Sequence, residues 1–465
     1  MTEHPASLNL PRVSPSPWPV FLTASIAVFL ISIDATVLYA AFPALALAFP
    51  RAPASDLSWI LNAYTVVYAV LLVPAGRFAD LYGRKRMFLA GLVVFLLASL
   101  GCGLSGQEWV LTGFRALQAV GAALLLPASL AVVLGAFPPE RRAIAVSLWG
   151  AISALGAAAG PSIGSWLIEL GGWPWAFYLN LPLGVLSVWG ASRLLQDVPA
   201  EGKPARLDVV GVLLLMLGVG SVALGLVQSE SLGWTSATVL TALIGGVAAL
   251  LVFVWWARRV PAPAIDLTLF DNATYRSVNL ATLAFGMAFS MMFFSYFLFM
   301  SGIWHLSVAE AGVSVLPGPL LVVPTSVVAG RFAARFGHRP LLVSGSLVFA
   351  AGALFTMLVP GLMPSYLTHW LPALLLTGIG TGLVLPSLSA AAVSRLDPAR
   401  FGVGSAINQA VRQIGTVLGV AVTVALLGHL SPQLSDFRTV FGWEAALCVV
   451  TALLCLSVDT RPGQQ

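Results

Sequence analysis

Charge is the scarcest property of this sequence. Only 9% of its 465 residues are Asp, Glu, Lys or Arg, whereas 58% are hydrophobic and the mean hydropathy is +0.93. Soluble globular chains carry about 25% charged residues, so this chain lacks the polar side chains that would cover a water-soluble surface. We therefore expect lipid to surround most of it.

Cysteine, histidine and lysine are scarce as well. Cys102, Cys448 and Cys455 lie in apolar stretches, which argues against a disulfide framework. The five histidines are scattered without an H-E-x-x-H pattern, so the sequence predicts neither a metal site nor a metalloenzyme. Lys85 and Lys203 lack the G-x-x-x-x-G-K-[ST] setting of an ATP-driven pump. We expect no enzyme, no catalytic residue, no metal and no cofactor.

Apolar runs are what the sequence has in abundance. Runs of about 20 residues cross a hydrocarbon core of about 30 Å as helices, which satisfy every backbone amide within one segment. The alternating polarity of a transmembrane barrel is absent. We predict an all-α integral membrane protein with fourteen spans, close to 21–46, 57–75, 87–106, 110–136, 143–168, 173–193, 208–228, 236–257, 277–300, 308–330, 340–359, 366–391, 402–428 and 440–457. The first of these is too long for a signal peptide, so we expect it to be retained.

Basic residues predict the orientation. Most fall on one side if both termini are cytoplasmic, for example Arg84, Lys85 and Arg86 after the second predicted span. These loops would face anionic inner-leaflet lipid, so the pI of 9.4 does not require nucleic-acid binding. We predict a multi-pass protein of the cytoplasmic (inner) membrane, with membrane lipid and not nucleic acid as partner. The preference for Arg over Lys favours a bacterial host with a GC-rich genome.

An internal repeat divides the chain. At an offset of 254 residues, GRFADLYGRKR (76–86) matches GRFAARFGHRP (330–340), and at an offset of 259 Gly156 matches Gly415. We predict a bundle of six spans over 1–195, an inserted linker with two spans over 196–272, and a second bundle of six spans over 273–465. Parallel repeats of this kind create a substrate site at their interface near the bilayer midplane.

Two charges are predicted deep in the membrane. Asp34 lies about thirteen residues, or roughly 20 Å, into the first span, and Arg115 lies about 8 Å from the outer end of the fourth. Both would then lie at nearly the same depth, and Asp34 is the one carboxylate that the sequence places deep in a span. Intramembrane charges are costly and therefore functional candidates. A carboxylate whose cationic partner comes and goes can change its protonation, so we predict proton coupling by this pair. A permanent structural salt bridge is the alternative.

Four further segments carry motifs. They are GRFADLYGRKR at 76–86, Arg115 to Gln118 with Gly121, the sequence WPWAFYLNLP at 173–182, and the span-5 set Gly156, Gly160, Pro161 and Gly164. Together with Asp34-Ala35-Thr36 they resemble motifs of the major facilitator superfamily, specifically of its fourteen-span drug:proton antiporter branch. The resemblance implies the major facilitator fold and antiport with the proton as coupling ion. Tyr39 departs from the branch, which often has Asn at that position.

The glycines of span 5 and the basic loop at 76–86 also support predictions that do not depend on the resemblance. Gly156, Gly160 and Gly164 recur every four residues, which predicts a close helix contact, and Pro161 favours a bend. At the cytoplasmic ends of spans 2 and 3 we predict a breakable latch that stabilises one conformation. Its residues are Gly76, Asp80, Gly83, Arg84 and Arg86. The alternative is that this loop is only a basic membrane anchor.

A substrate cavity is expected between the bundles. Its candidate residues are polar or aromatic groups within spans, namely Tyr39, Asn62, Tyr64, Gln118, Asn408, Gln409 and Arg412. The three from span 13 would alternatively hold the second bundle together by hydrogen bonds. We expect most of the aromatic run at 289–297 in span 9 to face lipid.

The sequence thus predicts proton-driven efflux of small lipophilic or cationic compounds by a monomer that uses alternating access. A single deep carboxylate offset by Arg115 favours neutral or singly cationic substrates over dications. One alternative is a lipid or metabolite carrier of the same fold, with symport as a possible mode of coupling. Another is a non-transporting receptor, which two intact repeats and the absence of a long soluble domain argue against.

Overall fold

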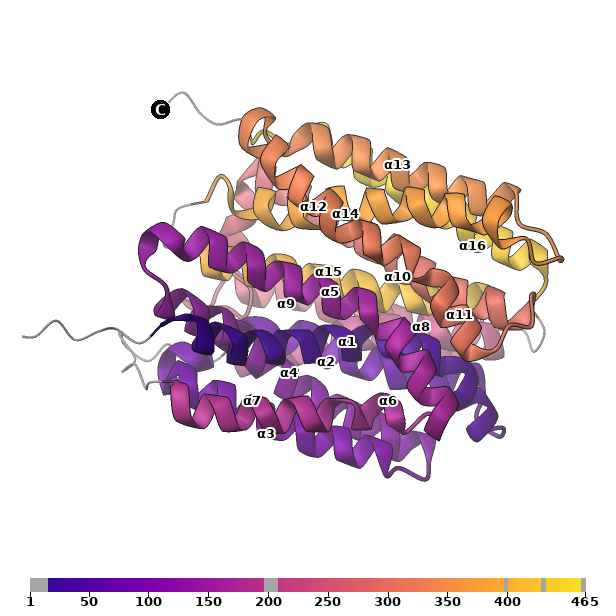
Figure 1. Ribbon diagram of the computed structural model, residues 1–465, viewed down its shortest axis with the longest axis horizontal. Coiled ribbons are helices and arrows are strands. Elements are labelled where there is room, and N and C mark those ends of the chain that lie inside the picture. Colours follow the sequence, from indigo (N-terminus) through magenta and orange to yellow (C-terminus); the bar gives the residue numbers. More distant parts are fainter. Residues whose placement is uncertain (1–15, 196–207, 397–399, 428–431, 461–465) are drawn as a thin grey trace, which may run out of the picture.

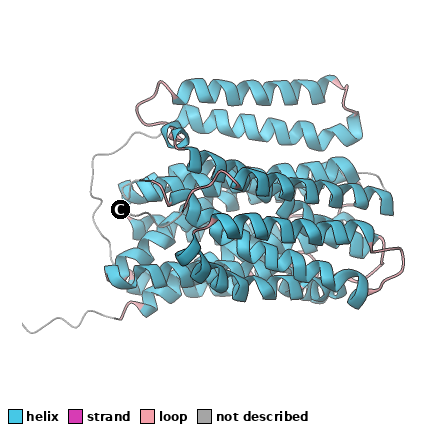
Figure 2. Cartoon of the chain, turned by 90° about the horizontal axis from the view of Figure 1, so that it is seen from above, coloured by secondary structure: helices cyan, strands magenta, loops and turns pink. Residues whose placement is uncertain are grey.

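The structure is a computed structural model that describes residues 16–195, 208–396, 400–427 and 432–460. Within these ranges the chain forms helices joined by short connections, and no strand (Figure 2). The helices lie side by side along one direction, and α1 begins at the same end of the bundle where α16 ends (Figure 1). The all-helical fold predicted from composition is confirmed.

The first half of the chain and the linker contain nine of the labelled helices, in an order that follows the predicted spans. They are α1 (Trp18–Ala48), α2 (Ala54–Tyr82), α3 (Arg84–Gly103), α4 (Glu108–Ala136), α5 (Pro139–Gly171), α6 (Trp175–Tyr178), α7 (Asn180–Leu194), α8 (Val209–Leu232) and α9 (Ala237–Ala257).

The second half begins with a short 3-10 helix and contains one π-helical turn. Its elements are η1 (Leu267–Asp271), α10 (Ala273–Gly302), α11 (Val308–Val315), α12 (Pro317–Phe336), α13 (Arg339–Leu358), η2 (Tyr366–Trp370), α14 (Leu371–Val393), α15 (Phe401–Leu427) and α16 (Leu434–Cys455).

Twelve helices in the described part are long and apolar enough to cross a membrane, so this is a multi-pass membrane protein. Each of the fourteen predicted spans overlaps a helix, but two of those helices are not among the twelve. The apolar stretch in α2, Asp56–Leu72, is shorter, and α7 has 15 residues after the four-residue α6. The count of fourteen stays a prediction.

The internal repeat is visible in how the helices touch. Gly160 on α5 comes so close to α1 that an added Cβ would lie 2.8 Å from the carbonyl oxygen of Ile33. In the second half, Gly419 on α15 stands in the same relation to Met287 on α10, at 2.5 Å. Ile33 and Met287 are related by the offset of 254 residues, and the two glycines by the offset of 259. The same packing therefore occurs twice.

The two matching loops also share a backbone conformation. Gly83 ends α2 with φ 95°, and Gly337, its counterpart at the offset of 254, ends α12 with φ 77°. Positive φ values are readily adopted only by glycine, which explains why this residue recurs in both loops.

The inserted helices form a hairpin that touches both halves. α8 packs against α9 on one side and against α2 and α15 on the other. Asp208, the N-cap of α8, accepts hydrogen bonds from the indole nitrogen of Trp256 (2.8 Å) and the backbone nitrogens of Gly211 (2.8 Å) and Ala264 (2.9 Å). This buried carboxylate joins the start of α8 to the end of α9. The predicted boundaries at 195 and 272 stay predictions.

The expectation that most aromatic residues of span 9 face lipid is wrong. Met292, Phe293, Phe294, Tyr296 and Phe297 on α10 are all buried, with at most 7% of each exposed. The reason is that α10 contacts α1, α14, α15 and α16. A helix that is apolar all round can be surrounded by either protein or lipid, and its sequence does not distinguish the two.

Candidate functional site

The predicted charge pair is in direct contact inside the first bundle. Asp34 on α1 is fully buried, and Arg115 on α4 is 2% exposed. The guanidinium donates a hydrogen bond of 2.6 Å to Oδ2 of Asp34. Two side chains that the sequence placed at nearly the same depth are therefore in direct contact.

Two amides complete the shell of the carboxylate. Oδ1 of Asp34 accepts hydrogen bonds from Nε2 of Gln118 and Nδ2 of Asn180, both 2.9 Å long. The same two nitrogens also donate to the hydroxyl of Ser99, at 2.7 and 3.2 Å. The sequence predicted Gln118 as a substrate-cavity residue, and it did not predict Ser99 or Asn180. Asn180 lies in the quoted motif at 173–182, and this was the available signal.

The cation of the pair has further partners. Arg115 donates from Nε to the carbonyl of Ile60 on α2 (3.1 Å) and from a terminal nitrogen to Oε1 of Gln118 (2.6 Å). Its guanidinium carbon lies 4.1 Å from the centre of the Tyr64 ring, at the range of a cation–π contact. A buried ion pair is stable only when hydrogen bonds satisfy the rest of each group, and here the neighbours supply them. We call Asp34, Ser99, Arg115, Gln118 and Asn180 the acid network.

The glycines of the span-5 motif allow α5 to pack closely against α1, the helix that carries Asp34. A Cβ added at Gly156 would lie 2.8 Å from the carbonyl oxygen of Phe29, and one at Gly164 would clash with a methyl group of Val37. Asp34 lies between these two contacts along α1. A shift of α5 must therefore move α1, or separate from it, close to the acid network.

The structure contains a small apolar cavity between the two bundles. Its volume is about 70 Å³, and it lies among α5, α10, α12 and α14, at the break between α11 and α12. Its lining is mostly aliphatic and aromatic: Ala157, Phe289, Met292, Phe293, Tyr296, Val315, Gly318, Pro319, Val322, Leu374, Thr377, Gly378, Thr381 and Leu385. We call this space the central cavity.

A proline contributes to this cavity from the first bundle. Pro161, inside α5, has no N–H to donate to the carbonyl of Ala157 four residues earlier. Ala157 is the residue through which α5 reaches the cavity. On the opposite side, the cavity meets the helix break that Pro317 introduces at the start of α12. Interrupted helices near a cavity are typical of transporter sites.

The repeat relates the cavity to the acid network. At the offset of 259, Leu374 and Thr377 correspond to Arg115 and Gln118, and both line the central cavity. The second bundle thus presents apolar lining where the first bundle holds its polar cluster.

The predicted cavity residues lie elsewhere, since none of the seven lines this cavity. Tyr39 comes nearest, because its ring stacks on Phe293 with centroids 6.0 Å apart. Asn62 is buried, with no partner for either amide atom among the described residues. Tyr64 and Gln118 instead contact Arg115 in the first bundle.

The polar residues of α15 face neighbouring helices. Asn408 donates to Oδ1 of Asn279 (3.1 Å) and the hydroxyl of Thr282 (2.9 Å), both on α10. For Asn408, these contacts agree with the alternative prediction, in which the polar residues of span 13 hold the second bundle together by hydrogen bonds. Gln409 is half-buried, and Arg412 interacts electrostatically with Tyr68 on α2.

The predicted latch makes contacts within the first bundle. Arg84 donates to the carbonyl of Ala131 at 3.3 Å, and Lys85 to that of Ser192 at 3.2 Å. Both carbonyls lie near helix C-termini, where cations are favoured. Among the other latch residues, Gly76 is half-buried, Gly83 is buried and Arg86 is exposed. The side chain of Asp80 lies outside the described residues.

The prediction that Asp34 is the one carboxylate deep in a span is wrong, because Glu444 is buried well inside a spanning helix. Glu444 on α16 is 0% exposed. The predicted span began at residue 440, but α16 begins at Leu434, so Glu444 lies ten residues, or about 15 Å, along the helix. Its Oε1 lies 2.9 Å from the hydroxyl of Ser295 on α10.

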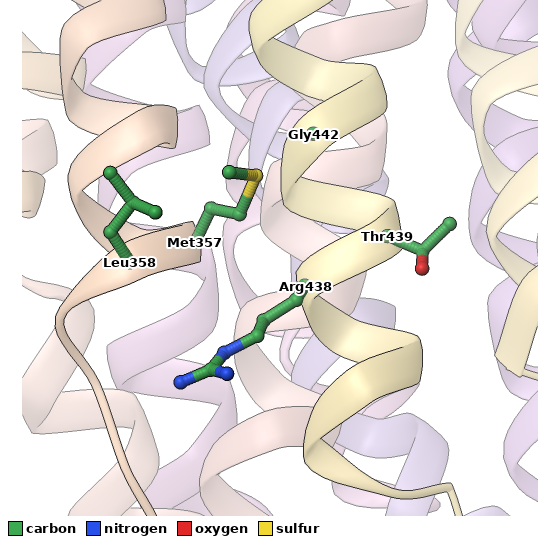
Figure 3. Close-up of a pocket in the computed structure, with 5 residues that line it drawn as sticks. All are labelled: Met357, Leu358, Arg438, Thr439 and Gly442. Carbon is green, nitrogen blue, oxygen red and sulfur yellow. The ribbon is translucent and has the colours of Figure 1, made fainter.

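A second hollow lies on the outside of the second bundle. Arg438, Thr439 and Gly442 of α16 and Met357 and Leu358 of α13 surround it (Figure 3). The helical repeat of 100° per residue puts Arg438 and Gly442 on a different face of α16 from the buried carboxylate. The hollow also shares no lining residue with the central cavity.

The sequence matches the Major Facilitator Superfamily over residues 24–208, 202–419 and 278–465. It is 34% identical over 461 residues to the puromycin resistance protein of Streptomyces alboniger, covering 95% of this chain and 90% of that protein. It is 31% identical to the multidrug resistance protein Stp of Mycobacterium tuberculosis, covering 87% and 75% of the two chains.

A solved structure of a bacterial homologue of the human drug peptide transporters has a similar fold, with a TM-score of 0.65 and 16% identity over 95% of this chain and 98% of that one. A solved structure from work on proton-dependent oligopeptide transporters gives a TM-score of 0.67, also at 16% identity, with the same coverage. At this identity the likeness concerns the fold alone. From its sequence matches, the chain belongs to the Major Facilitator Superfamily and is a membrane transporter rather than an enzyme.

Proposed function

We propose that this transporter exports small lipophilic compounds, neutral or singly cationic, in exchange for protons. The observation that carries the proposal is the acid network. Asp34 is a fully buried carboxylate with a cation at 2.6 Å, and this cation is on a different helix. Motion between α1 and α4 would separate the pair, and a desolvated carboxylate without its cation favours the protonated form. Proton uptake thereby becomes linked to the conformation.

The central cavity supports a lipophilic substrate. Its lining offers hydroxyl groups from Tyr296, Thr377 and Thr381 and no charged side chain. A drug-sized ligand needs a pocket of roughly 300–1,000 Å³, whereas this cavity measures about 70 Å³. The two bundles must therefore move apart to admit substrate, as alternating access requires. The relatives named for puromycin and multidrug resistance support export as the direction.

The topology is part of the proposal. We infer fourteen spans, with α2 and the α6–α7 pair crossing alongside the twelve longer apolar helices, and both termini in the cytoplasm. The basic residues of the even-numbered loops support this orientation. The proposed location is the inner membrane of a bacterium, and the proposed functional unit is a monomer.

Reconstituted proteoliposomes test the function. An imposed pH gradient should drive uphill movement of a fluorescent lipophilic monocation in the wild type and not in Asp34→Asn. The variant should still bind the cation, as measured by fluorescence quenching. The matched control is Glu169→Gln, because Glu169 is an exposed carboxyl at the end of α5.

The alternatives predict other results. Undiminished gradient-driven transport in Asp34→Asn would assign coupling to another group. If no tested cation moves with the gradient even in the wild type, a lipid or metabolite carrier becomes the better explanation. Tighter binding of dications than of monocations would contradict the proposed substrate charge.

A further inference from the structure

The buried carboxyl of Glu444 has no cation beside it. The described parts of the helices packed against α16 carry few ionisable groups: Tyr275, Arg276 and Tyr296 on α10, Arg339 on α13 and Arg412 on α15. Arg276 and Arg339 lie near the starts of their helices, at the end of the bundle away from the middle of α16. On α16 itself, Cys448 is the nearby ionisable group, and Arg438 is exposed.

Arg412 does not serve as the missing cation. It interacts with Tyr68 on α2, in the other bundle. No ion pair to Glu444 occurs among the described residues, and its Oε2 has no hydrogen-bond partner there. An ionised carboxylate buried without a cation or a full set of donors is strongly unfavourable. The surroundings therefore suit the neutral acid, in contrast to Asp34.

The hydrogen bonds around Ser295 agree with a proton on this carboxyl. The Ser295 hydroxyl oxygen lies 2.9 Å from Oε1 of Glu444 and 3.2 Å from the carbonyl oxygen of Met292. One hydroxyl has a single proton and cannot donate fully to both oxygens. If Glu444 is protonated, its O–H donates to Ser295 and the Ser295 O–H donates to Met292, so both contacts become hydrogen bonds.

The position of the carboxyl connects it to the central cavity. Ser295 is flanked on α10 by Tyr296, which lines the cavity together with Met292. Tyr296 also lies within electrostatic range of Glu444, and its hydroxyl is 3.2 Å from that of Thr356 on α13. Glu444 thus contacts Ser295, and it lies within electrostatic range of Tyr296 in the cavity wall.

From this geometry we propose that Glu444 is a second proton-binding site, which holds its proton while the central cavity is empty and releases it when a lipophilic cation occupies that cavity. A cation nearby favours the carboxylate, and its departure favours the acid. In the conformation described, the proton available for release is on Glu444, because Asp34 is already paired with Arg115. The role of the cation rests on the proposed function, whereas the protonated state of Glu444 does not.

Infrared difference spectroscopy of the purified, reconstituted protein tests the protonated state without a substrate. The carbonyl stretch of a protonated carboxyl should be present in the wild type at neutral pH and absent in Glu444→Gln. It should persist in Asp34→Asn and in Glu169→Gln. Ser295→Ala, which keeps the acid but removes its partner, should shift the band without abolishing it. An unchanged band in Glu444→Gln would overturn the proposal.

Proton release on binding tests the coupling. Tetraphenylphosphonium is added to weakly buffered protein with a pH indicator, and binding is followed separately by equilibrium dialysis. Binding should release protons from the wild type and from Asp34→Asn, and release should fall to the baseline in Glu444→Gln. If the cation binds but Glu444→Gln releases as many protons as the wild type, the coupling is refuted. If the wild type does not bind the cation, the proposed substrate class fails, and the infrared result still decides the state of Glu444.

Discussion

Replacing Arg115 by methionine should destabilise the protein more than replacing both members of the ion pair. Arg115→Met keeps much of the side-chain volume but leaves the Asp34 carboxylate with only its hydrogen bonds from Gln118 and Asn180. Removing one partner of a buried ion pair typically costs about 3–5 kcal/mol, and both groups here are at most 2% exposed. The free energy of unfolding should fall by that amount.

The double variant Asp34→Asn/Arg115→Met should recover most of this loss. It has no unpaired charge, so the remaining cost is mainly the hydrogen bond to the Ile60 carbonyl, worth about 1–2 kcal/mol. The second substitution should therefore restore roughly 2–3 kcal/mol of the stability lost in Arg115→Met.

The assay is reversible unfolding in mixed detergent micelles at alkaline pH, for the wild type, both single variants and the double variant. Glu169→Gln again serves as the control and should unfold like the wild type. If the double variant is no more stable than Arg115→Met, the unpaired Asp34 charge is not the source of the instability. The interpretation of the acid network as a buried, mutually dependent pair would then be wrong.

Three further predictions concern one helix contact and two loops. Gly160→Ala should reduce transport strongly and cost about 1–3 kcal/mol of stability by overpacking, since its Cβ would lie 2.8 Å from the Ile33 carbonyl; wild-type transport in this variant would contradict a tight α1–α5 contact. Gly83→Ala should cost about 1–3 kcal/mol, because φ 95° with ψ 135° suits only glycine, and an unchanged unfolding midpoint would argue against this turn. Burial lowers the pKa of His338 below its ordinary 6.5, so the unfolded chain binds more protons and stability should fall as pH drops below about 6.5. The melting temperature should change less with pH across this range in His338→Gln than in the wild type. An identical pH dependence in the two proteins would show that His338 is not the group responsible.

The sequence predicted the fold and one half of the site because both depend on distance along the chain. Apolar run lengths predict helices, and counting residues from the span ends put Asp34 and Arg115 at the same depth. The repeat offset of 254 residues correctly related Gly83 to Gly337, since both turns need a positive φ. These inferences need only the position of a residue along its helix. They do not need the direction in which its side chain points around the helix axis.

What the sequence did not predict depends on rotation and on helix ends. Asn180 and Ser99 complete the acid network because α7 and α3 turn these residues towards α1, and periodicity gives no such angle for helices that are apolar on all sides. Glu444 was overlooked because the predicted span began six residues later than α16 does. The cavity could not be located because it lies where α5, α10, α11, α12 and α14 meet, and the sequence does not show which helix faces meet.

The hairpin of α8 and α9 bears on the order of assembly during synthesis. The contacts of Asp208 close it within residues 208–264, and α2, one of the two helices on which α8 rests, precedes it in the chain. Domains generally fold in the order in which the ribosome produces them. The hairpin can therefore dock on the first bundle before α10 has been translated. The second bundle is then inserted against a surface already formed by α2 and α8, and this surface serves as a template that fixes the place of α15.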